Sequence, residues 1–253
     1  MKVAAIVQAR MGSTRLPGKV MKDIVGKPML WHIINRLKKT KLIDSITIAT
    51  TGKEIDKPIL KLAEDLGIDS FAGSEEDVLD RYYQAAKKFG VDVVVRLTAD
   101  CPLIDPRIID KVIQRYLKGD CDYAANTLKR TYPDGLDVEV FSYMALEKAW
   151  KEAKWASERE HGTPYIWKNP DKFMLANVEN SVNYSHLRWV VDEKEDLEFV
   201  RQVYGHLYRE GGLFYMEDVL DLLRKYPHLK QINQGIATNE GYAKSLRKDR
   251  MVK

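Results

Sequence analysis

The sequence predicts an α/β fold with a mostly parallel sheet, and three observations support this. Short runs rich in Val and Ile alternate with longer amphipathic stretches through roughly residues 1 to 120. Such alternation is typical of βαβ units, whose right-handed crossovers set neighbouring strands parallel. The chain has 253 residues, of which 45% are hydrophobic and 31% charged, so one large globular domain can bury a full core.

The first part of the chain contains four expected strands and four expected helices. Short apolar or β-branched runs predict strands at 3–7, at 45–50, near Phe71 and at 91–98. Apolar residues that repeat every three to four positions predict helices at 27–40, 55–66, 78–89 and 109–116. Gly67 and Gly90 end the second and third of these helices.

The pattern changes after residue 120. Two strands are expected at 123–126 and 136–140, joined by a segment whose Pro-Asp-Gly at 133–135 predicts a turn. In the second strand apolar residues alternate with Asp137 and Glu139, so both carboxylates share one face.

Helices dominate the remainder of the predicted structure. Ser142 is expected to cap a helix that runs to about Ala153, and Ser157 with Glu160 predicts a capping box for the next helix. Further strands are expected at 173–177 and 187–191, and further helices at 197–207 and 216–226. From residue 227 onward the sequence is polar, and we expect an irregular tail over 227–253.

A cationic loop, QARMGSTRLPGK, follows the first strand and spans residues 8–19. It offers Arg10, Arg15 and Lys19 together with two glycines and a serine. In an open α/β sheet, ligands bind beyond the carboxyl ends of the strands. Glycines let backbone N–H groups approach an anion and the cations compensate its charge, so a polyphosphate suits this loop. A solvated basic surface or a weak nucleic-acid contact is the alternative, because neither GxxxxGK[ST] nor GxGxxG is present.

Two aspartates follow two other expected strands and are candidate metal ligands. Asp100 comes just after the strand at 91–98, and Asp192 comes just after the strand at 187–191. Two carboxylates in the crevice beside the basic loop suit Mg²⁺, which keeps coordination sites for phosphate oxygens and water. The alternative is that each aspartate caps the helix that follows it.

Other polar clusters carry weaker signals. Asp120 and Asp122 form a DxD triplet, a pattern of metal-dependent glycosyltransferases, but here it lies in an expected turn and we predict that it is solvated. The five histidines lack the spacing of zinc ligands. His161 lies beside Glu160 where a polar substrate could dock, and a capping or surface role is the alternative.

Charge and composition exclude several classes of protein. A formal net charge of +4 is mild and does not favour nucleic-acid or membrane binding. Cys101 and Cys121 are too few for a disulfide framework and lack metal-ligand spacing. The sequence opens without a signal peptide, and no apolar run approaches the ~18 residues of a membrane span. We therefore expect a cytoplasmic protein with neither a nucleic-acid nor a membrane partner.

Several motifs resemble those of one enzyme family. QARMGSTRLPGK is similar to the opening signature of the sugar cytidylyltransferases, which activate acidic sugars as CMP-sugars. TADCPLID, YPDGLDVEVFS, SEREHGTPYI and WVVDEKEDLEFV resemble the spore-coat polysaccharide and acylneuraminate (CMP-Kdo synthetase-like) branch. The resemblance implies a three-layer α/β/α nucleotide-diphospho-sugar transferase (GT-A-like) fold with a mostly parallel sheet. It also implies one nucleotidyltransferase domain over 1–253, with a small inserted α+β lobe at 123–186 for sugar binding and dimerisation.

The resemblance assigns roles to individual residues. Arg15, Lys19 and Asp100 match catalytic positions, and Asp100 with Asp192 matches the two metal-binding aspartates, so the expected cofactor is Mg²⁺. Positions expected to bind nucleotide are Ala9, Arg10, Met11, Gly12, Ser13, Thr50, Thr51, Gly73, Ser74, Arg81, Thr98 and Ala99. Positions expected near the sugar are Asp137, Glu139, Glu160 and His161.

The implied reaction is Mg²⁺-dependent nucleotidyl transfer in surface polysaccharide biosynthesis. A hydroxyl of an acidic sugar, a nonulosonic or Kdo-like acid, attacks the α-phosphorus of CTP and gives CMP-sugar and pyrophosphate. The expected partners are CTP, the acidic sugar and a second copy of the chain in a homodimer. Two alternatives stay open, because fold does not determine function: a GT-A glycosyltransferase with a nucleotide-sugar donor, and a non-catalytic nucleotide-binding protein.

Overall fold

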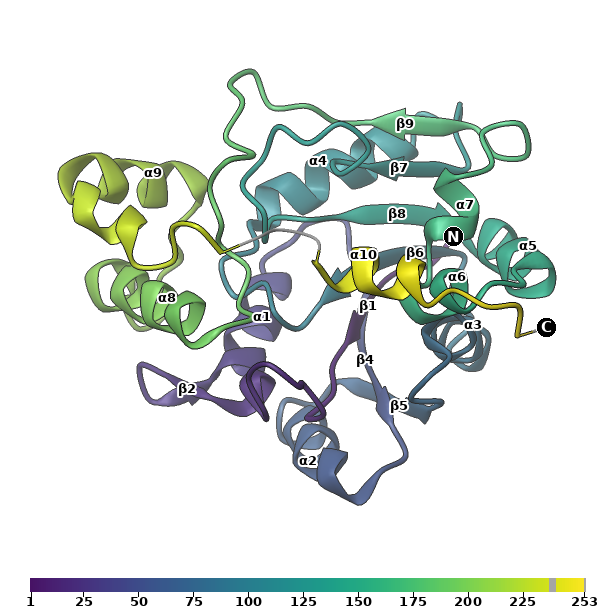
Figure 1. Ribbon diagram of the computed structural model, residues 1–253, viewed down its shortest axis with the longest axis horizontal. Helices are drawn as coiled ribbons and strands as arrows, with labels where there is room; N and C mark the ends of the chain where they lie inside the picture. Colours follow the sequence, from purple (N-terminus) through teal and green to yellow (C-terminus); the bar gives the residue numbers. More distant parts are fainter. Residues whose placement is uncertain (237–239, 253) are drawn as a thin grey trace.

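The computed structural model describes residues 1–236 and 240–252, apart from the side chain of residue 240. At its centre is a seven-stranded sheet with the order β5-β4-β1-β6-β8-β7-β9 (Figure 1). Its strands are β1 (Val3–Gln8), β4 (Ser45–Thr51), β5 (Asp69–Gly73), β6 (Val93–Thr98), β7 (Tyr123–Ala125), β8 (Glu139–Ser142) and β9 (Leu175–Asn177). A second sheet pairs β2 (Asp23–Ile24) with β3 (Lys27–Pro28).

The sheet is mostly parallel, which confirms the fold class expected from the alternation of strands and helices. β1 lies between β4 and β6 and is parallel to both, with Gln8 opposite Ala49 on one side and Thr98 on the other. β8 runs antiparallel to its neighbours β6 and β7. The carboxyl ends of β1, β4 and β6 therefore meet at one edge, and the segments that follow them are neighbours.

Helices cover both faces of the sheet and give three layers (Figure 1). One core contains residues of α1 (Met29–Leu37), α2 (Lys57–Asp65), α4 (Pro106–Tyr116), α8 (Lys194–Leu207) and α9 (Met216–Lys225). The other contains residues of α3 (Val78–Lys88), α5 (Tyr143–Glu152) and α7 (Pro164–Trp167), and α6 (Ala156–His161) contacts α3. Alternate residues of β6 serve the two cores: Val93 and Val95 face the first, and Val94 faces the second.

Some element boundaries differ from those expected. The apolar run at 187–191 is no strand; within the described residues it forms an isolated bridge between Arg188 and Asp134. Ser142 caps α5 as predicted, accepting from Ala145 N over 2.9 Å. The capping residue of α6 is Trp155 rather than Ser157, because Glu158 is the residue that reaches back to the start of the helix.

Two helical segments lie in the stretch for which the sequence predicted irregular structure. They are η3 (Pro227–Gln231) and α10 (Glu240–Arg247), and short η1 (Lys19–Met21) and η2 (Glu54–Asp56) occur earlier in the chain. β7, β8 and β9, which lie within 123–186, extend the main sheet. A separate sugar-binding and dimerisation role for 123–186 stays a prediction. No helix in the described part of the chain is long and apolar enough to cross a membrane.

Candidate active site

The basic loop is held at the carboxyl edge of the sheet by its own backbone and by an aspartate after β4. Met11 N donates to the Asp56 carboxylate over 2.6 Å. Met11 O accepts from Ser13 N at 2.9 Å and from Gly18 N at 3.0 Å. Gly18 has a φ of 67°, a conformation that glycine adopts without strain. These bonds close the loop and fix the position of Lys19 at the carboxyl edge of the sheet.

Lys19 bridges the two aspartates that the sequence singled out. Its Nζ lies 3.0 Å from Asp100 Oδ2 and 2.8 Å from Asp192 Oδ1, and it donates to Val191 O over 2.8 Å. Burial alone would lower the pKa of Lys19, but the two carboxylates outweigh burial and raise this pKa. Burial likewise opposes ionisation of Asp100, yet the charge of Lys19 holds the pKa of that carboxyl below its usual value. Lys19 and Asp100 thus face each other as charged groups.

Three cations surround Asp192. Besides Lys19, Arg15 Nη2 lies 2.9 Å from Asp192 Oδ2 and Arg188 Nη2 lies 3.3 Å from the same atom. Arg188 also makes two bonds of 2.9 Å to Asp196, which is fully buried. The Arg15 side chain is 30% exposed, so this guanidinium is accessible to a ligand.

Neither Asp100 nor Asp192 caps a helix, so the capping alternative is wrong. The N-cap of α4 is Asp105, whose carboxylate accepts from Arg107 N over 2.8 Å. The N-cap of α8 is Glu193, and the carboxylate that bonds its backbone N–H belongs to Asp196 in the first turn. Both candidate metal ligands therefore direct their charge to Lys19 rather than to a helix end.

A cavity of about 270 Å³ opens at this edge. Predicted site residues in its wall are Arg15, Thr98, Asp100, Asp137, His161 and Asp192. The other lining residues are Gln8, Arg96, Leu97, Cys101, Asp134, Arg188, Val190, Gly241 and Tyr242. The loop cation Arg15, both candidate metal ligands and two candidate sugar contacts thus share one cavity.

One wall of the cavity is an ion-pair cluster around Asp134. Arg130 holds Asp137 through two bonds of 2.8 and 2.7 Å. Asp134 lies farther from its cations, 3.7 Å from Arg130 and 3.6 Å from Arg188. Burial, and then the nearby charge of Asp137, raise the pKa of Asp134 to about 6. This carboxylate is thus incompletely neutralised where it faces the cavity.

The four residues expected near the sugar divide into two groups. Asp137 and His161 line the cavity. Glu139 is 6% exposed and pairs with Arg96, and Glu160 accepts a 2.8 Å bond from Ser245 Oγ. Burial lowers the pKa of His161, which favours its neutral form. Glu139 and Glu160 accordingly support residues of the cavity wall.

Arg10 and Gly12, which are expected to bind the nucleotide, lie on the side of the basic loop that faces Glu75, away from Arg15 and the cavity. Arg10 Nη1 lies 3.9 Å from Glu75 Oε1, and Lys53 pairs with the other oxygen of Glu75. Gly12 is close by, because a Cβ on it would lie 3.5 Å from Glu75 Oε1. Arg10 is exposed. The basic loop therefore contacts two parts of the site. Arg10 lies beside Glu75, just after β5, and Arg15 pairs with Asp192.

The remaining nucleotide candidates lie at the carboxyl ends of β1, β4, β5 and β6, except Arg81, which belongs to α3. Thr51 donates to Asp56, and Arg81 donates to the backbone oxygen of Ser74 over 2.6 Å. Thr50 Oγ1 and Arg81 Nε are buried and have no hydrogen-bond partner among the described residues. Backbone bonds hold two of the others: Ala9 N donates to Ala49 O, and Ala99 N donates to Gln8 O. The Thr98 hydroxyl contacts the Cys101 thiol, and Gly73 is the last residue of β5.

Sequence reasoning missed several residues that build the site, among them Asp56, Asp134, Arg188 and Tyr242. Asp56 fixes the loop, Asp134 and Arg188 line the cavity, and Tyr242 comes from the expected irregular tail. The Pro-Asp-Gly turn marked the position of Asp134 but not its burial. Their roles depend on contacts between distant segments.

The DxD triplet is remote from this site. It precedes β7, whose start lies at the edge opposite to the carboxyl ends of β1 and β6. Asp120 pairs with Arg115 and is 61% exposed, and the Asp122 carboxylate accepts from Met174 N over 2.8 Å. Asp120 is therefore solvated as predicted, whereas Asp122 is half-buried and bonds to the backbone.

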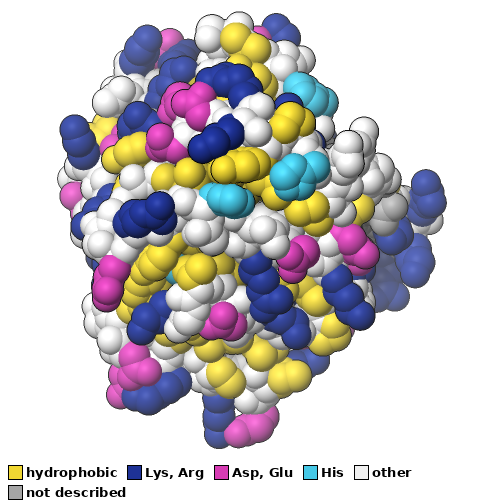
Figure 2. Space-filling model, turned by 90° about the vertical axis from the view of Figure 1, so that its left-hand side faces the viewer, with side chains coloured by type: hydrophobic (Ala, Val, Ile, Leu, Met, Phe, Trp, Pro, Cys, Tyr) yellow, Lys and Arg dark blue, Asp and Glu magenta, His cyan; other side chains and the backbone are white. Residues whose placement is uncertain are grey.

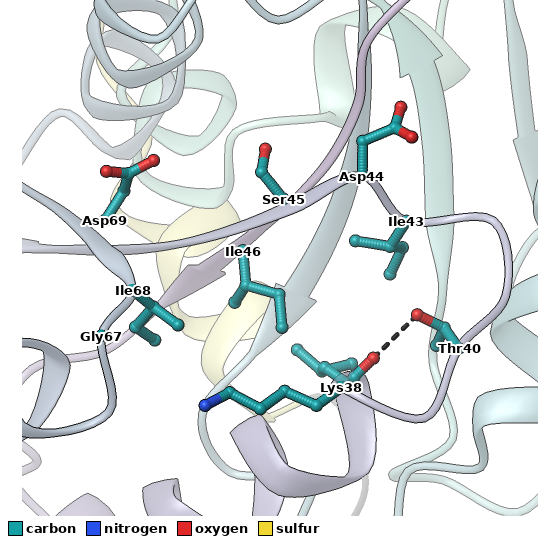
Figure 3. Close-up of a pocket in the computed structure, with 10 residues that line it drawn as sticks. Lys38, Thr40, Ile43, Asp44, Ser45, Ile46, Gly67, Ile68 and Asp69 are labelled. Atoms are coloured by element: carbon teal, nitrogen blue, oxygen red, sulfur yellow. Dashed lines mark hydrogen bonds between the residues drawn. The ribbon is translucent and has the colours of Figure 1, made fainter.

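A second cavity, of about 380 Å³, lies at that opposite edge, beside the starts of β4 and β5 (Figure 3). Lys38, Asp44, Ser45 and Asp69 are among its lining residues, which include none of the predicted site residues. Figure 2 shows another face, carrying α8 and α9, where positive and negative side chains are interspersed. The convergent charges described above are therefore a feature of the smaller cavity.

Comparison with known proteins places this geometry in a family. The cytidylyltransferase family model matches residues 4–238. The chain is 35% identical to a cytidylyltransferase of known structure from Leptospira borgpetersenii, with a TM-score of 0.87 over 94% of this chain and 99% of that one. It is 32% identical to the spore coat polysaccharide biosynthesis protein SpsF of Bacillus subtilis, over 79% of this chain and 85% of that protein. It is 33% identical to 3-deoxy-manno-octulosonate cytidylyltransferase of Geobacter metallireducens, over 51% of this chain and 50% of that enzyme.

These matches also confirm the fold expected from the sequence motifs. Nucleotidyltransferases with the nucleotide-sugar transferase fold are among the structural neighbours. The chain belongs to the cytidylyltransferase family and is a nucleotidyltransferase.

Proposed function

We propose that the protein transfers the cytidylyl group of CTP to a hydroxyl of an acidic sugar in a Mg²⁺-dependent reaction. The hydroxyl oxygen bonds to the α-phosphorus and gives up its proton to water, the bond to the bridging oxygen of the β-phosphate breaks, and pyrophosphate leaves. The observation that carries this proposal is the meeting of Lys19 with Asp100 and Asp192 at the mouth of the basic loop. Cytidylyltransferase relatives that act on 3-deoxy-manno-octulosonate or serve polysaccharide biosynthesis support the choice of substrates.

The donor set suits Mg²⁺. Asp100 and Asp192 both reach one cation, the Lys19 ammonium. Within the described residues no group of three or more His, Cys, Asp or Glu side chains could hold a metal. This fits Mg²⁺, which proteins usually bind through one or two carboxylates plus substrate phosphates. We assign Asp100 and Asp192 to the metal, which when bound neutralises charge at the reacting phosphate.

The chain's own cations bind and position the triphosphate. Lys19 and Arg15 face the leaving pyrophosphate, and Arg10 with the loop N–H groups holds the β- and γ-phosphates. Such positioning and charge neutralisation supply most of the catalysis that phosphoryl chemistry needs from a protein. The buried Thr50 Oγ1 and Arg81 Nε, unpartnered among the described residues, support nucleoside binding at the ends of β4 and β5.

The opposite side of the cavity holds the sugar. Asp137 and His161 line it, and Arg96 and Arg188 supply cations for the sugar carboxylate. Glu139 and Glu160 act there through Arg96 and Ser245. We further propose that the segment 123–186 supplies Asp137 and His161 to this part of the site and also the homodimer contact. Sedimentation equilibrium would test the dimer.

The direct test is pyrophosphate release with each nucleoside triphosphate, with and without Mg²⁺, against a panel of nonulosonic and Kdo-like acids. We expect release from CTP that requires both Mg²⁺ and a sugar acid. Asp122→Ala is the matched control for the aspartates, because its DxD triplet lies at the other edge, and it should keep full activity. Release of CMP or UDP from a nucleotide sugar, lost in Asp122→Ala, would instead identify a glycosyltransferase. CTP binding without turnover on any acid would identify a non-catalytic binder.

A further inference from the structure

The C-terminal segment returns to the candidate active site. α10 lies against α6 (Figure 1), and its start lines the same cavity as the end of β6. Gly241 and Tyr242, at its start, line the same cavity as Arg15 and Asp100. About 140 residues separate Asp100 from Tyr242 in the sequence, so this juxtaposition arises from the tertiary fold.

Both side-chain and backbone bonds hold the segment in place. Ser245 Oγ lies 2.8 Å from Glu160 Oε2 and 2.9 Å from His161 Nε2. The Asp249 carboxylate accepts from Ser157 N over 2.9 Å and from Ser157 Oγ over 2.6 Å. These bonds attach the segment to α6, the element that also supplies His161 to the cavity.

Backbone pairing continues beyond α10. Ala156 N donates to Arg250 O over 2.9 Å, and Val252 N donates to Lys154 O over 2.8 Å. Trp155 forms a bridge with Met251. A segment held by several bonds between residues 245 and 252 is a built part of the fold.

Tyr242 is fixed by its ring, whereas its hydroxyl is unused. The ring stands edge-on to His161 at 4.9 Å and to Trp167 at 5.8 Å, and the Lys168 ammonium lies 5.3 Å from its centre. The hydroxyl oxygen is buried and has no hydrogen-bond partner among the described residues. A buried hydroxyl without a partner is costly, so a phenol kept at a cavity wall indicates that a bound molecule supplies the acceptor.

We propose that Tyr242 is a substrate-binding residue whose hydroxyl donates to an oxygen of the acidic sugar. This inference rests on the proposed function. The sugar, rather than the triphosphate, is the partner because Tyr242 contacts His161 on the wall assigned to the sugar. The triphosphate has its own cations and N–H groups in the basic loop. The C-terminal segment therefore completes the acceptor site, and Ser245 and Asp249 position it.

The test compares Tyr242→Phe, which removes the hydroxyl alone, with the unchanged chain. We expect the KM for the sugar acid to rise about tenfold, the effect of one hydrogen bond to a charged acceptor. The KM for CTP should stay within about twofold and the melting temperature should not fall, because the lost hydroxyl has no hydrogen-bond partner among the described residues. Tyr226→Phe is the matched control, since this ring stacks on His206 away from the cavity.

A second variant separates positioning from contact. Ser245→Ala combined with Asp249→Ala removes the side-chain bonds that hold the segment and should also raise the KM for the sugar acid. Adding Tyr242→Phe to this double variant should raise it little further, because both changes disable the same contact. An unchanged KM for the sugar acid in Tyr242→Phe would overturn the inference and leave the proposed function intact. Absence of turnover by the unchanged chain with every acid would overturn both.

Discussion

Lys19 shows how a single residue organises the candidate site. The residue is only 9% exposed, and its ammonium bonds to two carboxylates and a backbone oxygen. Buried ion clusters of this kind contribute little net stability, because desolvation offsets much of their attraction. Asp100 and Asp192, the two carboxylates that bind Lys19, line one cavity, and we infer that they serve ligand binding rather than folding. A Mg²⁺–triphosphate would offer each of these groups a new partner of opposite charge.

Asp134 gives a prediction about pH and stability. Its pKa in the folded chain is about 6, above the ordinary 3.8, because it is buried beside another carboxylate. As pH rises, Asp134 loses its proton at a lower pH in the unfolded chain than in the folded chain. The free energy of unfolding therefore falls between about pH 4 and about pH 6. Asp134→Asn removes the effect and should stabilise the protein at pH 8 by up to about 3 kcal/mol, with no gain at pH 3.5. Urea unfolding at the two pH values measures this difference.

The control for this prediction is Asp171→Asn, which replaces an exposed aspartate outside the cavity. It should change the free energy of unfolding by less than about 0.5 kcal/mol at either pH. Equal stability of Asp134→Asn and the unchanged chain at pH 8 would mean that the Asp134 carboxylate is not destabilised by its surroundings.

Residue roles could be predicted from the sequence only where local pattern and chemistry coincide. Asp100 and Asp192 each follow an extended apolar run, and Lys19 ends a loop of cations and glycines, so their meeting could be expected. Asp134 and Tyr242 gave no such signal, because their importance depends on burial by segments far away in the chain.

At the scale of elements, the turn at Gly135 joins two parts of the site. Gly135 has a φ of 111°, and a Cβ on it would lie 2.6 Å from the backbone of Trp189 and Val190. Asp134 O accepts from Trp189 N over 2.6 Å, so the turn is fixed directly to the segment that carries Arg188. Close backbone approach, not merely chain reversal, explains the glycine.

Gly135→Ala should therefore destabilise the protein by at least about 1–3 kcal/mol, the cost of a strained backbone position, before the overlap with Trp189 is counted. The matched control is Gly205→Ala, an exposed position inside α8 with no atom within 4 Å of the added Cβ. That change should stabilise by about 0.5–1 kcal/mol, because alanine favours a helix interior. Thermal unfolding of both variants tests this, and a stabilised Gly135→Ala would contradict the structure of the turn.

Strands and helices of the first 120 residues could be predicted from periodicity, because a parallel sheet with amphipathic helices has a strong local signature. The run at 187–191 was misjudged because burial alone does not make a strand. Trp189 and Val191 are buried in the core, yet within the described residues this segment forms a single isolated β-bridge, between Arg188 and Asp134. α10 was missed because its polar sequence gains its structure from α6.

For the whole molecule, the site is a meeting of six distant segments at one edge of the sheet. The basic loop, the ends of β6, the turn at 133–135, α6, which supplies His161, the segment at 188–192 and the start of α10 all line one cavity. The order of strands brings the first two together, so a sequence pattern of strand ends could anticipate them. The other four reach the cavity through tertiary contacts that no local sequence pattern predicts.

Steady-state pyrophosphate formation from CTP and a sugar acid by Lys19→Ala, with Lys39→Ala as control, tests whether Lys19 acts in catalysis. Lys39 is an exposed lysine after α1, so its removal should leave kcat and KM unchanged. Because Lys19 is proposed to stabilise charge that develops during transfer, Lys19→Ala should lower kcat by about 10²–10³-fold while the KM for CTP changes little. A normal kcat with only a raised KM would contradict the central claim that Lys19, Asp100 and Asp192 form one catalytic centre.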